Sequence, residues 1–354
     1  MTYSWPQQSS TPDVDKARAW GDSWRGSVLD RNRVTLPAAR GWGGTPWEGT
    51  GRQVTMRSSA ADNSWTSVCW SPELQLFCAV SQTGTGNRVM TSPNGTTWTA
   101  RSSATDNNWT SVCWSPQLRL FAAVSNSGTG NRVMTSEDSI TWTSRTSASD
   151  NSWQSVCWSP DLRLFCAVSF NGTNNRVMTS PNGINWTSRT SAAENNWRGV
   201  CWSPELRLFC AVAGSGTSNR VMTSPNGINW TARQAANNTA QWTTICWSRE
   251  LNLFCALANS FIATRIMTSP DGITWSQPSN PLSGTYVTVV WVPEIALFVS
   301  GASTGSLYTS PNGSTWTLRD NNTPSVGSIC WSPELRILCG VSTTGSGNRT
   351  LTSP

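Results

Sequence analysis

The sequence of 354 residues contains no histidine, and Lys16 is its only lysine. Without histidine the chain lacks the commonest general base and the commonest metal ligand, so we expect no metal site. Nothing else in the sequence predicts a cofactor. Charged residues make up 12% of the chain, and its net charge of +6 is not gathered in a basic block. The composition therefore gives little support to nucleic-acid binding.

Long hydrophobic runs are also missing from the sequence. No window approaches the roughly 20 apolar residues of a membrane span, so insertion into a membrane is not expected. The N-terminus, MTYSWPQQSSTPDVDK, has no basic segment followed by an apolar run, so no signal peptide is predicted. We therefore expect a chain made in a reducing cytoplasm.

What the chain does contain is one unit repeated seven times. The element CWSPEL returns, with variations, at intervals of about 44 residues, a period that is typical of β-propellers with several short strands per unit. We expect the tryptophan of this element to be mostly buried in every copy. Its seven occurrences are Trp70, Trp114, Trp158, Trp202, Trp247, Trp291 and Trp331.

Each repeat divides into four short segments that alternate large apolar with small polar residues, as strands do. In the first repeat these are strand A (66–70), strand B (75–80), strand C (88–92) and strand D (97–101). Residues Glu73-Leu74 form the A–B turn, which sets Cys69 opposite Cys78. The fold class predicted is all-β: a seven-bladed β-propeller of four-stranded antiparallel blades.

The two ends of the array predict how the ring closes. The seventh repeat stops at Pro354, before its strand D, whereas residues 52–56 precede the first repeat where a strand D belongs. An N-terminal strand that completes the last blade would leave no open sheet edge. We therefore predict a propeller over residues 51–354, preceded by an extended N-terminal arm over residues 1–50.

A second tryptophan motif follows strand C. In five of six copies the sequence is T-S-P-[ND]-G, followed by a tryptophan such as Trp98, and the second repeat departs with Ser136-Glu137-Asp138-Ser139. The motif resembles the Asp-box of sialidases and related propellers. It is more similar still to the S-P-D-G-x-x-W repeat of bacteriophage and giant-virus proteins. The resemblance implies a propeller in which Asn or Asp bonds the turn backbone and Trp packs between blades.

Sialidase chemistry is not expected from this resemblance. That family uses a tyrosine nucleophile with its glutamate, an acid/base aspartate and three arginines, whereas this chain has three tyrosines. No isolated carboxylate departs from the repeat, and a catalytic pair needs two specific environments rather than seven similar ones. We therefore predict that the protein is not an enzyme.

Other residues recur at fixed places. Arginine begins strand C in six repeats, and an acid occupies the A–B turn in six. Such rings either bind a ligand or hold neighbouring blades together, and the second interpretation is favoured. The eleven cysteines fall at two positions that also hold Ala or Val, which marks a small apolar core site. Strained cross-strand disulfides are possible, but buried thiols are favoured.

The D–A loops carry the candidate ligand-binding residues. An acid or amide beside an aromatic ring is how lectins hold sugars, since polar groups take hydroxyls and the ring stacks on the pyranose. In the alternative interpretation the tryptophans begin strand A and are buried, while Asp and Asn cap the loop. The residues are Asp62, Asn63, Trp65, Asp106, Asn107, Trp109, Asp150, Asn151, Trp153, Glu194, Asn195 and Trp197.

The arm carries the candidate partner-binding residues. Five tryptophans in a segment rich in Pro and Gly are unusual for plain disorder, and Trp and Arg are enriched at protein interfaces. We predict that the arm contacts another protein chain through Trp5, Arg18, Trp20, Trp24 and Arg25.

Two functional hypotheses follow. The first is a non-enzymatic virion structural protein of a tailed phage, assembled in the host cytoplasm. The propeller would face outward from the capsid, tail or baseplate, and the arm would dock on other virion proteins. Recognition of a host-surface glycan is compatible with this role. The alternative is a free lectin or adhesin that binds carbohydrate through the loop rim.

Overall fold

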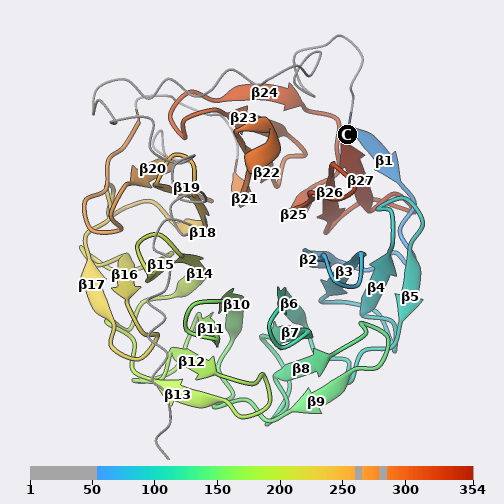
Figure 1. Ribbon diagram of the computed structural model, residues 1–354, viewed down its shortest axis with the longest axis horizontal. Coiled ribbons are helices and arrows are strands. Elements are labelled where there is room, and N and C mark those ends of the chain that lie inside the picture. The colour runs from blue at the N-terminus through green and yellow to red at the C-terminus, as the bar shows by residue number, and fades with distance from the viewer. Residues whose placement is uncertain (1–53, 260–264, 279–284, 354) are drawn as a thin grey trace, which may run out of the picture. The chain divides into compact units, whose positions relative to one another are not determined.

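The computed structural model describes residues 54–259, 265–278 and 285–353, which form seven antiparallel sheets around a central axis (Figure 1). Each repeat supplies one blade, in which strand A is innermost and strand D outermost. The seven-bladed, all-β propeller predicted from the repeat is confirmed. The arm residues Trp5, Arg18, Trp20, Trp24 and Arg25 lie outside the described residues.

The blades follow one another along the chain. Blade one contains β2 (Trp65–Ser71), β3 (Leu76–Ser81), β4 (Val89–Ser92) and β5 (Thr99–Arg101). Blade two contains β6 (Trp109–Ser115), β7 (Leu120–Ser125), β8 (Val133–Ser136) and β9 (Thr143–Arg145). Blade three contains β10 (Trp153–Ser159), β11 (Leu164–Ser169), β12 (Val177–Ser180) and β13 (Thr187–Arg189). Blade four contains β14 (Trp197–Ser203), β15 (Leu208–Ala213), β16 (Val221–Ser224) and β17 (Thr231–Arg233).

The last three blades vary more. Blade five contains β18 (Trp242–Ser248), β19 (Leu253–Ala258) and β20 (Ile266–Ser269). Blade six contains β21 (Tyr286–Val292), the 3-10 helix η1 (Pro293–Ile295), β22 (Leu297–Ala302), β23 (Leu307–Ser310) and β24 (Thr317–Asp320). Blade seven contains β25 (Val326–Ser332), β26 (Ile337–Ser342), β27 (Thr350–Ser353) and the N-terminal strand β1 (Thr55–Arg57).

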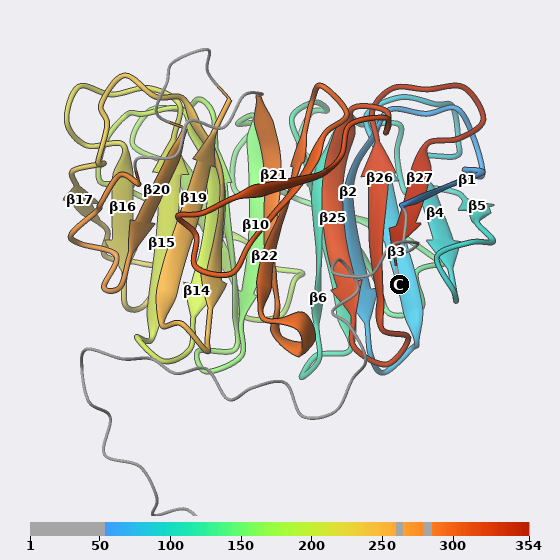
Figure 2. The ribbon, with the colours of Figure 1, turned by 90° about the horizontal axis from the view of Figure 1, so that it is seen from above.

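The strand register agrees with the sequence prediction. Cys69 lies opposite Cys78, although Ser71 pairs with Leu76, so the A–B turn spans four residues rather than two. Gln75 closes that turn with a φ of 49°, in the left-handed region. Figure 2 shows the strands running between two edges of the ring. We call the edge with the A–B and C–D turns the turn edge, and the edge with the B–C and D–A loops the loop rim.

Blade five departs from the predicted four strands. Among the described residues its outermost segment keeps one bridge, between Thr268 and Ser276. Pro278 stands where blade one has Arg101, which pairs with Val89. Proline has no backbone N–H to donate to a ladder, so the pairing of the outer strand cannot extend in the same way.

The N-terminal strand closes the ring as predicted, with a small shift. We expected residues 52–56, whereas the strand is β1 (Thr55–Arg57), paired antiparallel with β27. Thr55 lies opposite Thr352 and Arg57 opposite Thr350. The Arg57 Nε donates to Thr352 Oγ1 at 3.0 Å, and Thr350 Oγ1 donates to the Arg57 carbonyl at 3.0 Å. Residues 52 and 53 lie outside the described part of the chain.

The core lies between neighbouring blades. Trp114 and Phe121 of blade two pack with their ring centroids 4.5 Å apart, and the same cluster includes Val80 of blade one. The expected burial of the CWSPEL tryptophan is confirmed for Trp70, Trp114, Trp158 and Trp202. Trp247, Trp291 and Trp331 are of intermediate exposure, so they too are mostly buried, although less completely than the other four. The core is therefore less completely covered in the last three blades.

Candidate functional site

The recurring acids of the A–B turns bind the neighbouring blade. The Trp114 indole Nε1 donates to Glu73 Oε2 at 2.6 Å, and Trp70 donates in the same way to Glu334 across the closure of the ring. In blade two Gln117 replaces the acid, and its Oε1 accepts from the Trp158 indole at 2.6 Å. The bond therefore needs an oxygen acceptor but not a negative charge. Trp331 is the exception, because its enclosed Nε1 has no hydrogen-bond partner among the described residues.

The C–D turns are closed by their Ser and Asn or Asp side chains. In blade one Asn94 Oδ1 accepts from the backbone N–H groups of Thr96 and Thr97, both at 2.9 Å. In blade two Asp138 makes the equivalent bonds, although its sequence departs from the motif. Burial opposes ionisation of Asp138, but these donors outweigh it and lower its pKa. The Asn or Asp of the motif therefore serves the turn.

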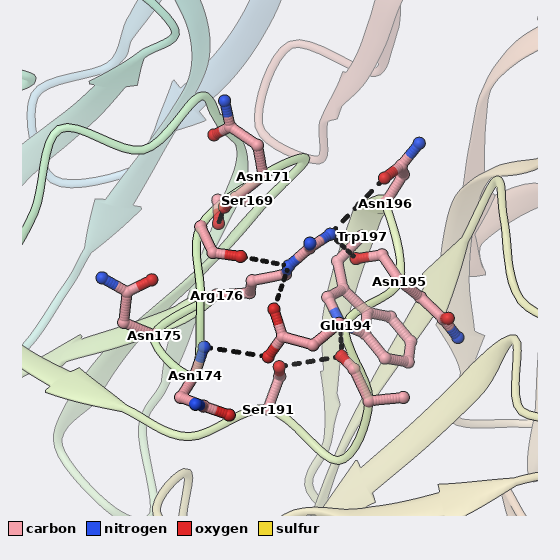
Figure 3. Close-up of polar contacts among 12 residues, drawn as sticks. Ser169, Asn171, Asn174, Asn175, Arg176, Ser191, Glu194, Asn195, Asn196 and Trp197 are labelled. Carbon is pink, nitrogen blue, oxygen red and sulfur yellow. Dashed lines mark hydrogen bonds and ion pairs between the residues drawn. The ribbon is translucent and has the colours of Figure 1, made fainter.

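At the loop rim the candidate acids bind the preceding blade. Glu194 accepts from the Asn174 N–H at 2.9 Å and pairs with Arg176 Nε at 3.0 Å (Figure 3). Asp106 and Asp150 accept from a glycine N–H and pair with the arginine that begins strand C. Asp62 does the same with Gly347 and Arg349, which joins the two ends of the ring. The four carboxylate side chains remain 40–50% exposed.

The candidate amides and tryptophans of the same loops point inward. Asn63 Nδ2 donates to the Asn87 carbonyl at 2.9 Å, and the three equivalent amides make the same bond at 2.7–2.9 Å. The candidate tryptophan rings are fully buried, and each indole N–H donates to a carbonyl of its own loop. The rings are Trp65, Trp109, Trp153 and Trp197.

Each of these loops therefore joins two blades, with the acid bound to the blade before it and the amide to its own blade. The indole face that a lectin would stack on a sugar is enclosed at all four candidate positions. Of the predicted constellation the acids alone stay at the surface. The amides Asn107, Asn151 and Asn195 are buried to the same degree as Asn63.

All eleven cysteines are free thiols, and each is buried or half-buried in the blades. Burial raises the pKa of the Cys78 thiol to about 12. The facing thiol of Cys69 also has a raised pKa, through burial and then through the neighbouring cysteines. Such thiols stay protonated at neutral pH and have little nucleophilic character.

A cavity of about 350 Å³ lies at the centre of the ring. All seven innermost strands line it with the residue that follows the first residue of strand A. This position breaks the repeat, since it holds three threonines, a glutamine, an arginine, a valine and a glycine. In chain order these are Thr66, Thr110, Gln154, Arg198, Thr243, Val287 and Gly327.

The threonines at this position join neighbouring blades, whereas the arginine does not. Thr66 Oγ1 donates to the Trp109 carbonyl at 2.7 Å. The guanidinium carbon of Arg198 instead lies 5.1 Å from the centroid of the Phe170 ring, in a cation–π contact. Its Nε is enclosed and has no hydrogen-bond partner in the described part of the chain, and burial lowers the pKa of the side chain.

Sequence reasoning missed this cavity. We expected the chain to keep its sevenfold regularity, but Gln154 and Arg198 depart from it at the axis of the ring. The signal was present in the sequence, because the second position of strand A is threonine in three repeats and a different residue in each of the other four. Comparison of recurring residues does not identify the second position of strand A, because its residue differs between repeats.

Solved structures support the fold. The structure resembles the virginiamycin B lyase of Staphylococcus aureus (TM-score 0.71, 8% identity), with 85% of this chain and 98% of that chain covered. A streptogramin B lyase (TM-score 0.72, 8% identity) is covered over 97% of its length, and YCF48 bound to D1 peptide (TM-score 0.61, 14% identity) over 94%, each with 85% of this chain. No family model and no curated protein matches the sequence.

The described residues contain neither a membrane-spanning helix nor a cluster of metal ligands. No helix there is long and apolar enough to cross a membrane. No group of three or more acidic or cysteine side chains in the same part of the chain is placed to hold a metal ion.

Proposed function

We propose that this protein is a non-enzymatic structural component of a virus particle, of the tailed-phage type. The propeller is a rigid module displayed outward from the capsid, tail or baseplate. The arm over residues 1–50 docks on other virion proteins. The protein is assembled into the particle in the host cytoplasm, and the virion is its final location.

One observation carries the non-enzymatic, scaffolding part of this proposal. With the exception of Glu294, the repeated acids at both edges of the ring bond to a neighbouring blade or close a turn, as Glu73 does with Trp114 and Glu194 with Arg176. Carboxylates used in this way stabilise the ring and are not arranged as an acid and a base in two different environments. The virion part is supported by the resemblance of the C–D turn motif to viral propeller repeats.

The turn edge offers a docking surface. The residue that follows the C–D turn glycine, or Ser139 in blade two, is an isoleucine in four consecutive blades, and each isoleucine is 45–50% exposed. In blades one and six the same place holds Thr96 and Ser314, so the turn itself does not require an apolar residue. Exposed apolar side chains at a repeated position favour contact with a partner protein. The four are Ile140, Ile184, Ile228 and Ile273.

The experiment compares the isolated protein with the assembled particle. Mass spectrometry of purified particles should detect the chain. Hydrogen exchange should then show residues 1–45 unprotected in the isolated protein and protected in the particle. A variant with all four isoleucines replaced by threonine, the residue of blade one, should fold normally and attach less well. Absence of the chain from purified particles would contradict the proposal.

A second candidate, a free lectin, is favoured by the four rim acids that remain partly exposed. Equal protection of the arm in the isolated protein and in the particle would favour it, because the arm would then cover its own propeller. A glycan array probed with the wild type and with an Asp106→Asn variant would test it directly. Binding that depends on Asp106 would support carbohydrate recognition at the rim.

A further inference from the structure

Three departures from the repeat meet at Arg198, which lines the central cavity. Arg198 replaces the threonine found in three other blades, and Phe170 supplies the ring beside its guanidinium. Gly214 provides the space, because a Cβ atom there would lie 2.7 Å from Arg198 Nε. The equivalent of Gly214 carries a side chain in every other blade, such as Asn126 in blade two. The arginine, its aromatic neighbour and its space therefore form one local arrangement.

The charge of Arg198 is not neutralised within the described residues. No carboxylate lines the cavity, and Arg198 makes no ion pair or hydrogen bond in the described part of the chain. A buried donor without a partner costs free energy, and a buried charge costs more. Arg176, which begins a strand C, instead donates to the carbonyls of Gly172 and Phe170 and pairs with Glu194.

Serine hydroxyls add further donors to the same wall. Ser67 Oγ accepts from the Val112 N–H at 3.1 Å, and Ser111 accepts from Val156 at 3.1 Å. Ser155 and Ser328 accept equivalent bonds at 3.3 Å. An oxygen that accepts a backbone N–H keeps its own O–H to donate. No acceptor for these hydroxyl protons is found among the described residues, and all four serines line the cavity.

We propose that the central cavity binds a small carboxylate ligand, with the carboxylate on the Arg198 guanidinium and its other polar groups on the serine and threonine hydroxyls. The planar guanidinium can form a bidentate pair with a carboxylate, through two parallel N–H···O hydrogen bonds. One unopposed positive charge balances a monoanionic group better than a phosphate dianion. A volume of about 350 Å³ is at the lower end of ligand pockets, so the ligand is a small molecule.

The test measures binding of named acids to the full-length protein. Lactate and glycerate, which are monoanions with hydroxyl groups, are titrated by calorimetry, beside lactamide and glyceramide as neutral isosteres and glycerol 3-phosphate as the phosphate arm. In parallel, ¹⁵N-arginine labelling follows the Nε–H resonance of Arg198, which is assigned by its absence in Arg198→Gln. Blade three carries Gln154 at the same position, so this variant should keep its fold and melting temperature.

The control is Arg163→Gln, which removes the same charge from an exposed A–B turn, where blade one has Gln75. We expect a carboxylate to bind and shift the Arg198 resonance, and Arg198→Gln to weaken binding by about tenfold or more. Arg163→Gln should leave the affinity unchanged. The proposal is overturned if neither acid shifts the resonance or if the amides bind equally well. Tighter binding of glycerol 3-phosphate, or equal weakening in both variants, also overturns it. The result does not depend on whether the protein belongs to a virion.

Discussion

At the scale of single residues, the indole–acid bond at the turn edge is the contact most open to test. Glu73→Gln should change the free energy of unfolding by less than about 0.5 kcal/mol, because Gln117 already accepts the same bond from Trp158. Glu73→Leu leaves the Trp114 N–H, on an indole 7% exposed, without an acceptor and should cost about 1–3 kcal/mol. Urea denaturation at neutral pH measures both. Equal losses in the two variants would show that the charge, rather than the acceptor, matters.

The cysteines give the protein a predicted sensitivity to alkali. Burial raises the folded pKa of the thiols above the unfolded value of about 9, as for Cys78 at about 12. Their contribution to stability is therefore complete below pH 9 and is lost as the pH rises toward the folded pKa, by up to about 1.4 kcal/mol per pH unit for each thiol. With reductant present, the urea concentration at the unfolding midpoint should decrease as the pH is raised from 8 to 10.5.

Cys78→Ala, which copies Ala122 of blade two, should fold and should reduce this fall. Under denaturing, non-reducing conditions all eleven thiols should react with an alkylating agent, whereas the native protein should react slowly. Five protected pairs after denaturation would instead show cross-strand disulfides. A pH-independent midpoint would mean that the thiols are already accessible in the folded state.

At the scale of elements, strand order and register could be predicted because each repeat carries its own turn chemistry. Blade two shows how this works when the motif changes. Ser139 takes the left-handed conformation, with a φ of 62°, at the place where blade one has Gly95, and Asp138 still closes the turn. The outer strand of blade five could not be predicted by analogy alone. The substitution of Pro278 for an arginine removes a backbone donor, and that effect is local and specific to one copy.

The candidate site was harder to predict than the fold for a physical reason. Tryptophan beside Asp and Asn is compatible with an exposed ring that stacks on a sugar and with a buried ring that holds the loop. The sequence pattern alone does not say whether the indole is exposed or buried. Strand A begins at Trp65, and the alternation of the strand directs that ring inward to full burial. The exposed acids and the buried rings are therefore neighbours in sequence but lie on opposite sides of the loop.

At the scale of the whole molecule, the sevenfold repeat predicts the ring but does not predict the cavity at its axis. Residues that recur hold the blades together, so they could be found by comparing the repeats. Arg198 and Gln154 differ from their counterparts, and their meeting at one cavity is visible only when seven strands are brought around one axis. A departure from the repeat is therefore a better guide to a ligand site in such a ring than a recurring residue.

Closure of the ring is the property on which the whole molecule depends, and it rests on β1. Removal of residues 1–53 keeps β1 and its pairing with β27, so it is the matched control for a deletion that takes β1 away. Removal of residues 1–57 takes away β1 and its pairing with β27. The loss of about three ladder bonds should then cost on the order of 3 kcal/mol.

The longer deletion also exposes β27 as an unpaired edge, and such edges associate with one another. Size-exclusion chromatography should therefore show a concentration-dependent dimer for the 1–57 deletion and a monomer for the 1–53 deletion. Urea denaturation of the two proteins, side by side with the full chain, measures the difference in stability. The bonds that the Gly347 N–H donates to Asp62 and that Arg349 donates to the Asn63 carbonyl remain in both deletions, so the ring should still form. If the two deletions were equally stable, those loop bonds would close the ring by themselves and β1 would be dispensable.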